Sequence, residues 1–257
     1  MIKRIGIMGA MTEEIRRLIA ELDSDTVIEE GMRTYHLGHL WGTAVVLVVS
    51  RIGKVAAAAT ATHLIAKLGV QEILFTGVGA SSTLAVGDIV VGTRLYQHYM
   101  DARPLFDRYE IPLLGVRSFA TQPERTEDLL KAAQNYIAGK FHEEISSADR
   151  EEFHLTRPRV VSGEIASGDK FFANKSELDE LGARLPNVLC AEMEGAAVAQ
   201  ICHEYGIPFS IIRTISDSGD ENAHLNFPKF IETVASIYSH GIVREFLQNQ
   251  RASSPKI

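Results

Sequence analysis

The chain has 257 residues, of which 46% are hydrophobic and 23% are charged, and its net charge is −7. This length suits one large domain with a sizeable core and is short for two domains. Because no cluster of lysine and arginine forms a basic stripe, the sequence argues against a nucleic acid or an anionic membrane as partner.

The first half of the chain alternates apolar runs of strand length with segments of helical periodicity. In chain order they predict a strand at Ile5–Met8, a helix at about Glu13–Leu22, a hairpin of Tyr35–Leu40 and Thr43–Ser50, an Ala-rich helix at Val55–Leu68 and a strand at Glu72–Thr76. The last of these strands ends in the glycine-bearing turn Gly77-Val78-Gly79.

The second half continues the alternation around one long irregular segment. It predicts strands at Asp88–Tyr96, Arg159–Ile165 and Phe209–Ser216, and helices at Thr126–Ala138, Ala191–Tyr205 and Phe227–Leu247. Met100–Pro123 has little periodicity and reads as a loop, and loops of that length in a compact domain tend to be functional or to form interfaces.

Strands that are apolar on both faces and alternate with helices predict an α/β fold. We expect a three-layer sandwich, in which helices flank a mixed, mainly parallel twisted sheet, because the strands before Ala56 read as a meander. A single domain is predicted over residues 1–250, followed by a disordered tail at 251–257.

The compartment can be inferred from the cysteines and from the N-terminus. Cys190 and Cys202 form no Cys-x-x-Cys pattern, and buried free thiols in a reducing compartment are the better interpretation. The apolar run Ile5–Met11 is broken by two glycines and soon reaches acidic residues, which is unlike a signal peptide. No apolar run approaches the length of a membrane span. A cytoplasmic protein is predicted.

Carboxylates gather where a pocket is expected. In open α/β sheets, ligands bind beyond the carboxyl ends of the strands. Glu14 follows the first strand, Glu192 and Glu194 stand at a strand-to-helix junction, and Asp217 follows the strand at Phe209–Ser216. The nine histidines show no metal-ligand spacing, so neither a metal nor an organic cofactor is predicted.

Each of these residues also has a purely structural interpretation. Glu14 could favour the positive end of a helix dipole, and Asp217 could be a turn residue. Glu192 and Glu194 could be first-turn helix acids, but their surroundings are nearly all small and apolar, and a buried carboxylate is costly unless it is paired or liganded. Arg213 lies in an apolar strand and needs an anionic partner, which the acidic cluster would supply as a structural ion pair or as part of a site.

Several stretches together resemble one known family. They are Ile5-Gly6-Ile7-Met8-Gly9-Ala10-Met11 with Glu13-Glu14, Ile52-Gly53-Lys54-Val55-Ala56-Ala57-Ala58, Val86-Gly87-Asp88-Ile89-Val90, Ser167-Gly168-Asp169, Glu192-Met193-Glu194 and Arg213-Thr214-Ile215-Ser216-Asp217. The chain resembles the methylthioadenosine/S-adenosylhomocysteine nucleosidases, within the purine-nucleoside phosphorylase-like superfamily. The resemblance implies hydrolysis of the N-glycosidic bond of a 5′-thio-substituted adenosine.

The resemblance also implies roles by position. Glu14 matches the residue that activates water, and Asp217 matches the acid that protonates adenine at N7. Glu194 matches the carboxylate that holds the ribose hydroxyls. The other matching pocket residues are Ile52, Val78, Gly79, Phe171, Phe172, Glu192, Met193, Arg213, Ser216 and Phe227. A homodimer is implied too, with Phe106 and Pro112 of the long loop as candidates for a cap over the partner's site.

Two positions depart from the family pattern, and two other functions stay open. Arg51 stands where such nucleosidases have Gly, and Val78 stands where they often have Ser. If Arg51 pointed into the pocket it could bind an anion, and a phosphate-dependent nucleoside phosphorylase would be the alternative. A non-catalytic nucleoside-binding protein is a third possibility, because fold alone does not fix function.

Overall fold

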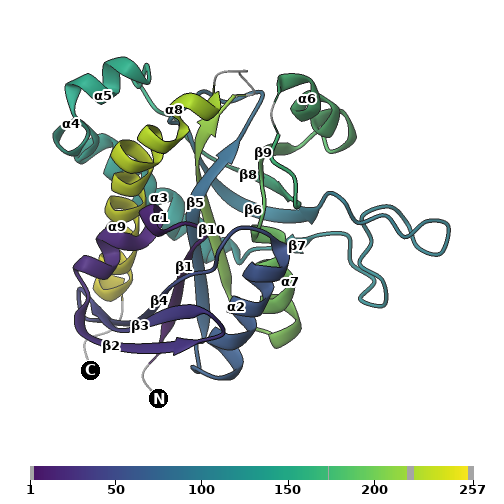
Figure 1. Cartoon of the computed structure of the whole chain (residues 1–257), viewed down its shortest axis with the longest axis horizontal. Coiled ribbons are helices and arrows are strands. Elements are labelled where there is room, and N and C mark those ends of the chain that lie inside the picture. The colour runs from purple at the N-terminus through teal and green to yellow at the C-terminus, as the bar shows by residue number, and fades with distance from the viewer. Residues whose placement is uncertain (1–2, 173, 219–222, 254–257) are drawn as a thin grey trace.

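The computed structural model describes residues 3–172, 174–218 and 223–253 (Figure 1). Its first elements are β1 (Ile5–Gly9), α1 (Thr12–Ala20), β2 (Asp23–Glu30), β3 (Arg33–Leu40), β4 (Thr43–Val49), α2 (Lys54–Ala66) and β5 (Glu72–Ala80). The chain continues with β6 (Ile89–Gln97), β7 (Phe119–Ala120), α3 (Pro123–Gly139), α4 (Phe141–Glu144), α5 (Ser147–Glu152), β8 (Val160–Ser167) and α6 (Lys175–Arg184). It closes with β9 (Val188–Glu192), α7 (Gly195–Tyr205), β10 (Phe209–Asp217), α8 (Ala223–Phe230), a π-helical turn (Ile231–Ala235) and α9 (Ser236–Ser253).

The strands form one mixed sheet that closes on itself at one end. Strands β4, β1, β5 and β10 run parallel to one another. Strand β10 also pairs antiparallel with β6, which continues through β8 and β9 back to β5. The antiparallel meander β2–β3–β4 extends the open end. The carboxyl ends of β1, β5 and β10 therefore meet at one edge.

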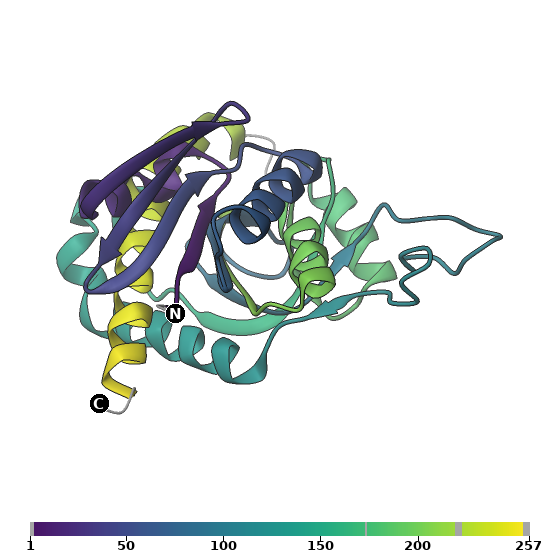
Figure 2. The same ribbon diagram turned by 90° about the horizontal axis from the view of Figure 1, so that it is seen from below.

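Helices cover both faces of the sheet and make the three layers that the sequence predicts (Figures 1 and 2). On one face, α1, α3 and α9 bury a core that includes Ile15, Leu129 and Phe246. On the other face, α2 and α7 bury a second core that includes Leu64 and Val198. The predicted α/β sandwich with a mixed sheet is confirmed. The sequence did not predict that the sheet closes through the pairing of β9 with β5.

The predicted elements correspond well to the observed ones, with a few omissions. Every predicted strand and helix exists, with ends that differ by a few residues. The sequence missed β2, β7, the short helices α4 and α5, and α6, and it merged β9 with α7. It also predicted one terminal helix where the structure has α8, a π-helical turn and α9. Strand β2 is polar and lies at the edge of the sheet, so its composition gives little strand signal. Of the tail predicted at 251–257, residues 251–253 continue α9 and residues 254–257 lie outside the described part.

The long loop after β6 projects from the body of the molecule (Figure 1). It is largely irregular up to β7, with one bridge between Ile111 and Val116. Its exposed large apolar side chains include Leu105, Leu113 and Leu114. The prediction of a long irregular loop at this place is confirmed.

Two further expectations can be compared with the structure. Cys190 and Cys202 are both buried and free, as predicted. Within the described residues, no helix is long and apolar enough to cross a membrane.

The packing of α9 against α3 depends on one glycine. A Cβ on Gly241 would lie 2.1 Å from Cε2 of the buried Tyr136 ring. We expect Gly241→Ala to lower the free energy of unfolding by about 1–3 kcal/mol, because extra volume in a packed core forces neighbours apart. Urea unfolding followed by circular dichroism measures this.

Gly182 in α6 supplies the matched control, because a Cβ there would meet nothing within 4 Å. Gly182→Ala should raise the free energy of unfolding by roughly 0.5–1 kcal/mol, since alanine has the better helix propensity. Equal effects of the two substitutions would contradict the packing argument.

Candidate active site

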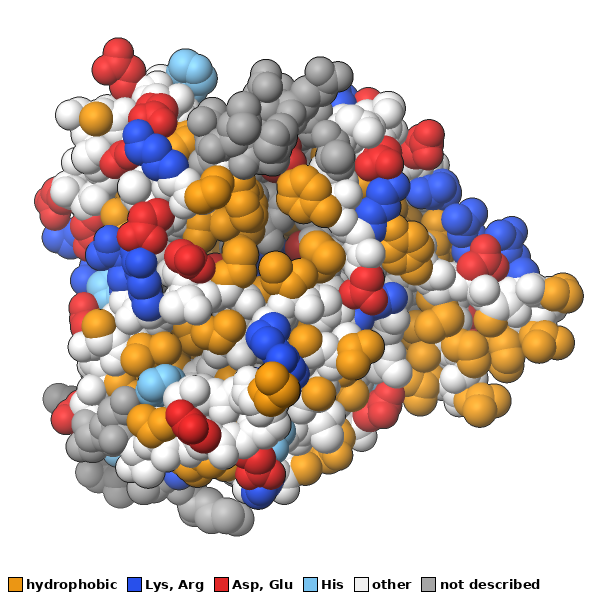
Figure 3. Space-filling model, in the orientation of Figure 1, with side chains coloured by type: hydrophobic (Ala, Val, Ile, Leu, Met, Phe, Trp, Pro, Cys, Tyr) orange, Lys and Arg blue, Asp and Glu red, His pale blue; other side chains and the backbone are white. Residues whose placement is uncertain are grey.

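One pocket opens at the edge where the carboxyl ends of β1, β5 and β10 meet. It holds about 710 Å³ of space, which includes open solvent at its mouth. Hydrophobic side chains gather around the hollow on this face of the molecule (Figure 3). The lining residues are Ala10, Met11, Glu14, Ile52, Val78, Gly79, Ala80, Lys170, Phe171, Phe172, Ala191, Glu192, Met193, Glu194, Arg213, Ser216, Asp217 and Phe227.

Glu14 is fixed on one wall of the pocket by backbone donors. Its carboxylate accepts hydrogen bonds from the N–H groups of Ala10 (2.6 Å), Met11 (3.0 Å) and Val78 (3.2 Å). Burial raises the pKa of Glu14, although Arg213 and the three backbone donors act in the opposite direction. Glu14 is thus a positioned carboxylate with a stronger affinity for a proton than an exposed glutamate has.

Beneath the pocket lies a buried ion pair between Arg213 on β10 and Glu192 at the end of β9. Arg213 donates through Nη2 (2.7 Å) and Nε (3.3 Å) to the same carboxylate oxygen of Glu192. Glu192 also accepts the N–H groups of Glu194 and Gly195 and the hydroxyl of Ser167. The sequence predicted that Arg213 needs an acidic partner, and this partner is Glu192.

Glu194 lies at the start of α7 and points toward α2. Its Oε1 accepts the backbone N–H of Gly53 at 2.7 Å, so it joins two segments far apart in the sequence. Burial, followed by repulsion from Glu192, raises the pKa of Glu194 to about 8. A buried carboxylate held in this way is suited to accept hydrogen bonds from a polar ligand group, such as a hydroxyl.

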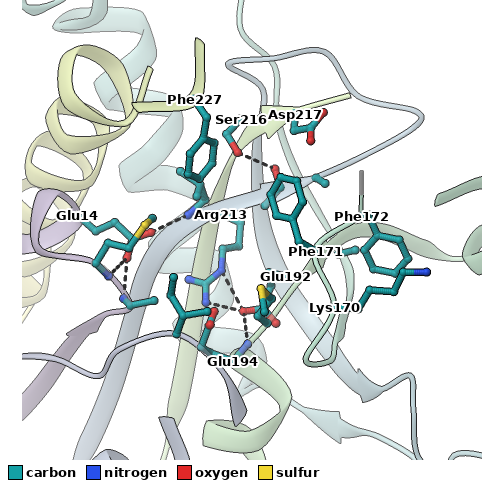
Figure 4. A pocket seen from close by; sticks show the side chains of 18 residues that line it. Glu14, Lys170, Phe171, Phe172, Glu192, Glu194, Arg213, Ser216, Asp217 and Phe227 are labelled. Carbon is teal, nitrogen blue, oxygen red and sulfur yellow. Dashed lines mark hydrogen bonds and ion pairs between the residues drawn. The ribbon is translucent and has the colours of Figure 1, made fainter. Parts of the chain in front are cut away.

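The opposite side of the pocket combines Asp217 with aromatic walls (Figure 4). Asp217 ends β10 and is 2% exposed, and Ser216 beside it donates a hydrogen bond to the carbonyl oxygen of Gly79 at 3.5 Å. The ring of Phe171 is half exposed and stands edge-on to Phe227, with ring centroids 6.4 Å apart. The half-exposed ring of Phe171 offers an apolar face on which a flat ring could stack.

The arrangement favours a ligand that is flat at one end and hydroxylated at the other. Aromatic walls and Asp217 line one side, whereas Glu14 and Glu194 line the other (Figure 4). Positive charge that develops between the carboxylates would be stabilised there. Among the described residues, no group of His, Cys, Asp and Glu side chains could hold a metal ion.

All the catalytic and substrate-binding residues that the sequence predicted line this pocket. Sequence reasoning missed Ala10, Met11, Ala80, Lys170 and Ala191. The three alanines carry no chemical signal, although Ala10 and Met11 belong to the motif that contains Glu14. Phe106 and Pro112 lie on the projecting loop and do not line the pocket of their own chain.

Arg51 does not line the pocket. It lies in a neighbouring groove with Arg33, Ile52 and Lys54 at the start of α2. The pocket's only lining cations among the described residues are Arg213, which pairs with Glu192, and Lys170, which pairs with Glu177. The sequence left a phosphate co-substrate open only if Arg51 pointed into the pocket, and in this structure Arg51 does not line it.

Comparison with known proteins extends over nearly the whole chain. Residues 4–248 match the model of the phosphorylase superfamily. The 5′-methylthioadenosine/S-adenosylhomocysteine nucleosidase of Chromohalobacter salexigens is 35% identical over 237 residues, which cover 91% of this chain and 92% of that protein.

Solved structures give the same result. S-adenosylhomocysteine nucleosidase from Streptococcus pyogenes in complex with 5-methylthiotubericidin is similar with a TM-score of 0.82 and 30% identity, covering 96% of this chain and 97% of that one. The corresponding nucleosidase from Neisseria meningitidis in complex with methylthio-immucillin-A has the same TM-score and identity, with coverage of 96% and 99%. Both structures hold nucleoside analogues.

The raised pKa of Glu194 predicts how stability depends on pH. A carboxyl whose pKa rises from 4.5 in the unfolded chain to about 8 in the folded protein stabilises the fold below about pH 4.5 and loses that contribution as the pH rises through 8. Relative to Glu194→Gln, the unfolding free energy of the unmodified protein should fall between pH 5 and pH 8, by at most about 1.4 kcal/mol per pH unit.

Urea unfolding of both proteins at four pH values in this range measures the difference. Glu14 also has a raised pKa, but it is present in both proteins and cancels. Glu180→Gln, on the exposed face of α6, is the control and should give a flat difference. If the difference in unfolding free energy between the unmodified protein and Glu194→Gln also stayed constant with pH, Glu194 would be ionised in the folded protein at neutral pH.

Proposed function

The chain belongs to the phosphorylase superfamily and, within it, to the 5′-methylthioadenosine/S-adenosylhomocysteine nucleosidases, and we propose that Glu14 and Asp217 perform the proton transfers of its reaction. The reaction is hydrolysis of the N-glycosidic bond of 5′-methylthioadenosine and S-adenosylhomocysteine, which releases adenine. The enzyme is an N-glycosyl hydrolase. The observation that carries the assignment of the two residues is that both carboxyls are buried in one pocket, on opposite sides of it.

Asp217 acts on the leaving group. Adenine leaves poorly as an anion, and protonation of a ring nitrogen makes it a neutral leaving group. The base stacks on the half-exposed ring of Phe171, and Asp217 in its protonated form donates to N7. Ser216, beside Asp217, helps to fix the end of β10 through its hydrogen bond to Gly79.

The sugar develops positive charge as the bond to adenine breaks. Glu194 accepts hydrogen bonds from the ribose hydroxyls, and Met193 packs under the ring. In their ionised forms the carboxyls around the sugar lower the energy of the oxocarbenium-like transition state, and the developing positive charge favours that ionisation. Glu192 acts indirectly, because its oxygens are engaged by Arg213 and by the start of α7.

Glu14 activates the attacking water. Three backbone N–H groups hold its carboxylate in one orientation, and burial raises its pKa toward the range where a general base works best near neutral pH. The same wall in a phosphorylase would have to attract phosphate. A buried carboxylate repels that anion, so the site favours water over phosphate as the nucleophile.

The test is adenine release from 5′-methylthioadenosine in phosphate-free buffer. We expect release at the same rate with and without added phosphate, with free methylthioribose as the sugar product. Asp217→Asn and Glu14→Gln should each lower kcat by roughly 10²–10⁴-fold, since each removes one proton transfer. Asp217→Asn should still bind the nucleoside, which isothermal titration measures.

Glu13→Gln is the matched control, since Glu13 adjoins Glu14 in α1 but does not line the pocket. It should retain the normal rate. Release that requires phosphate and yields a sugar 1-phosphate would make the enzyme a phosphorylase. Near-normal turnover by Asp217→Asn would exclude Asp217 as the acid, and full activity of Glu14→Gln would mean that water is activated elsewhere.

The working unit is a homodimer in which the projecting loop of one subunit caps the pocket of the other. The loop carries Leu105, Leu113 and Leu114 as exposed apolar side chains. Apolar surface of this kind is usually covered by a partner. Phe106 and Pro112 lie on the same loop but outside their own pocket, which leaves them available for the partner's.

The dimer can be tested by complementation. Phe106→Ala should raise KM for 5′-methylthioadenosine, by about tenfold, because the apolar 5′ group loses its cover. A mixed dimer of Phe106→Ala with Asp217→Asn contains one site with both groups intact. We therefore expect the mixture, after subunit exchange, to be more active than the sum of the two separate proteins.

The separate proteins at the same total concentration are the control, and light scattering after gel filtration reports the assembly. Activity of the mixture equal to the sum would mean that Phe106 acts on its own chain or not at all. A monomer at assay concentration would exclude the capping model.

We place the protein in the cytoplasm. Two buried cysteines that stay free suit a reducing compartment. Its substrates, as named for the relatives, are small molecules, and no metal or organic cofactor enters the proposed steps.

A further inference from the structure

A second, shallower groove adjoins the pocket at the start of α2. Ile52 lines both the groove and the pocket, so it forms the boundary between them. Gly53 lines the groove and donates its N–H to Glu194 in the pocket. Asp169, on the other wall of the groove, directly precedes Lys170 in the pocket wall. A ligand whose sugar contacts Glu194 can therefore extend past Ile52 into this groove.

The groove carries an excess of positive charge together with a single carboxylate. Its charged residues are Arg33, Arg51, Lys54 and Asp169. Asp169 accepts the backbone N–H of Lys54 at 2.8 Å, and the Nζ of Lys54 stands 3.8 Å from its other oxygen. This geometry holds Asp169 in place but leaves about half of its side chain exposed.

Within the described residues, neither Arg33 nor Arg51 forms an ion pair with a carboxylate. The guanidinium of Arg33 donates to the hydroxyl of Thr60 and to two backbone carbonyl oxygens, all of them neutral. Arg51 is exposed and forms no ion pair with a carboxylate in the described part of the chain. Burial, followed by repulsion from Arg51, lowers the pKa of Arg33. An anion bound beside Arg51 would relieve this repulsion.

The backbone conformation of Arg51 also supports a functional role for this residue. Its φ is +71°, in the left-handed region that favours glycine. Glycine would be the less strained residue there, yet the chain has an arginine in the groove beside the pocket. Non-glycine residues in this region tend to cluster at functional sites, where the side chain is used.

We propose that the groove binds the charged α-amino-acid end of a 5′-thio substituent, with the carboxylate at Arg51 and Lys54 and the ammonium at Asp169. Arginine forms paired hydrogen bonds with a carboxylate, and the arrangement of cations beside one carboxylate complements a zwitterion. S-adenosylhomocysteine carries such an end, whereas 5′-methylthioadenosine does not. This subsite rests on the proposed nucleosidase function and determines the preference of the enzyme among its substrates.

The test compares three substrates in the intact enzyme. They are S-adenosylhomocysteine, 5′-methylthioadenosine, and 5′-butylthioadenosine, which has a four-carbon chain without the charged groups. Arg51→Gln should raise KM for S-adenosylhomocysteine about tenfold and leave its kcat unchanged, because the lost contact is remote from the reacting bond. KM for the other two should change less than twofold. Arg51→Lys should restore most of the loss.

Arg51→Gly is a second variant that removes the side chain. Glycine adopts a positive φ without strain, so we expect this variant to fold normally. It should give the same selective loss. In the unmodified enzyme, rising salt concentration should raise KM for S-adenosylhomocysteine and for neither of the other two substrates. In Arg51→Gln, salt should leave KM for S-adenosylhomocysteine unchanged.

Equal losses for all three substrates would overturn the subsite and would mean that Arg51 shapes the loop or contacts the partner subunit. An unchanged KM for S-adenosylhomocysteine in both variants would overturn it as well. If the unmodified enzyme released adenine from 5′-methylthioadenosine and only the selectivity failed to change, the subsite alone would be wrong. If it released adenine from none of the three, the proposed function itself would fail.

Discussion

The site depends on one buried cation. Burial alone would lower the pKa of Arg213, but Glu192, Glu14 and Glu194 together raise it. The guanidinium in turn favours the ionised forms of Glu14 and Glu194, against the effect of their burial. Without Arg213, the three buried glutamates that interact with it would lose their main opposing charge, and they would take up protons or open the site to water. The ion pair with Glu192 also anchors the start of α7, where Glu194 lies.

The closed part of the sheet explains how these groups come together. β10 pairs with β5 along nearly its whole length, and β5 lies beside β1, so Asp217, Val78 and the segment after Gly9 reach one edge. β9 meets β5 only at Ala80 and Ala191, which brings Glu192 beneath the same edge. The register also requires small residues, because a Cβ on Gly77 would lie 2.6 Å from Oε1 of Glu14. Topology thus converts residues spread over two hundred positions into one pocket.

The sequence predicted the strands and helices well wherever apolar periodicity was strong, as in β1, β5 and α2. It missed β2, whose exposed polar residues form a strand only because β3 lies beside it. The rule that ligands bind at carboxyl strand ends, joined to the family resemblance, identified the residues that now line the pocket. It could not have found Ala10, Ala80 or Ala191, which contribute shape and no chemistry. Nor could it have identified Glu192 as the partner of Arg213 rather than Glu194, because that choice depends on the exact turn between β9 and α7.

The same geometry links the stability of the fold to catalysis. Glu194 and Glu14 are held in positions where burial makes ionisation costly, as their raised pKa values show. In water, two such carboxylates would be solvated, and they would have to reorient before they could stabilise a cation. Here the fold has already set the orientation of both groups, so a developing oxocarbenium charge meets carboxyls that need no rearrangement, and that charge lowers their pKa values and favours their ionised forms. A ground-state nucleoside is neutral at this point and gains much less. Burying these acids lowers the stability of the folded protein, but their interaction with the sugar is stronger in the transition state than with the bound substrate. Only interactions that are stronger in the transition state accelerate the chemical step.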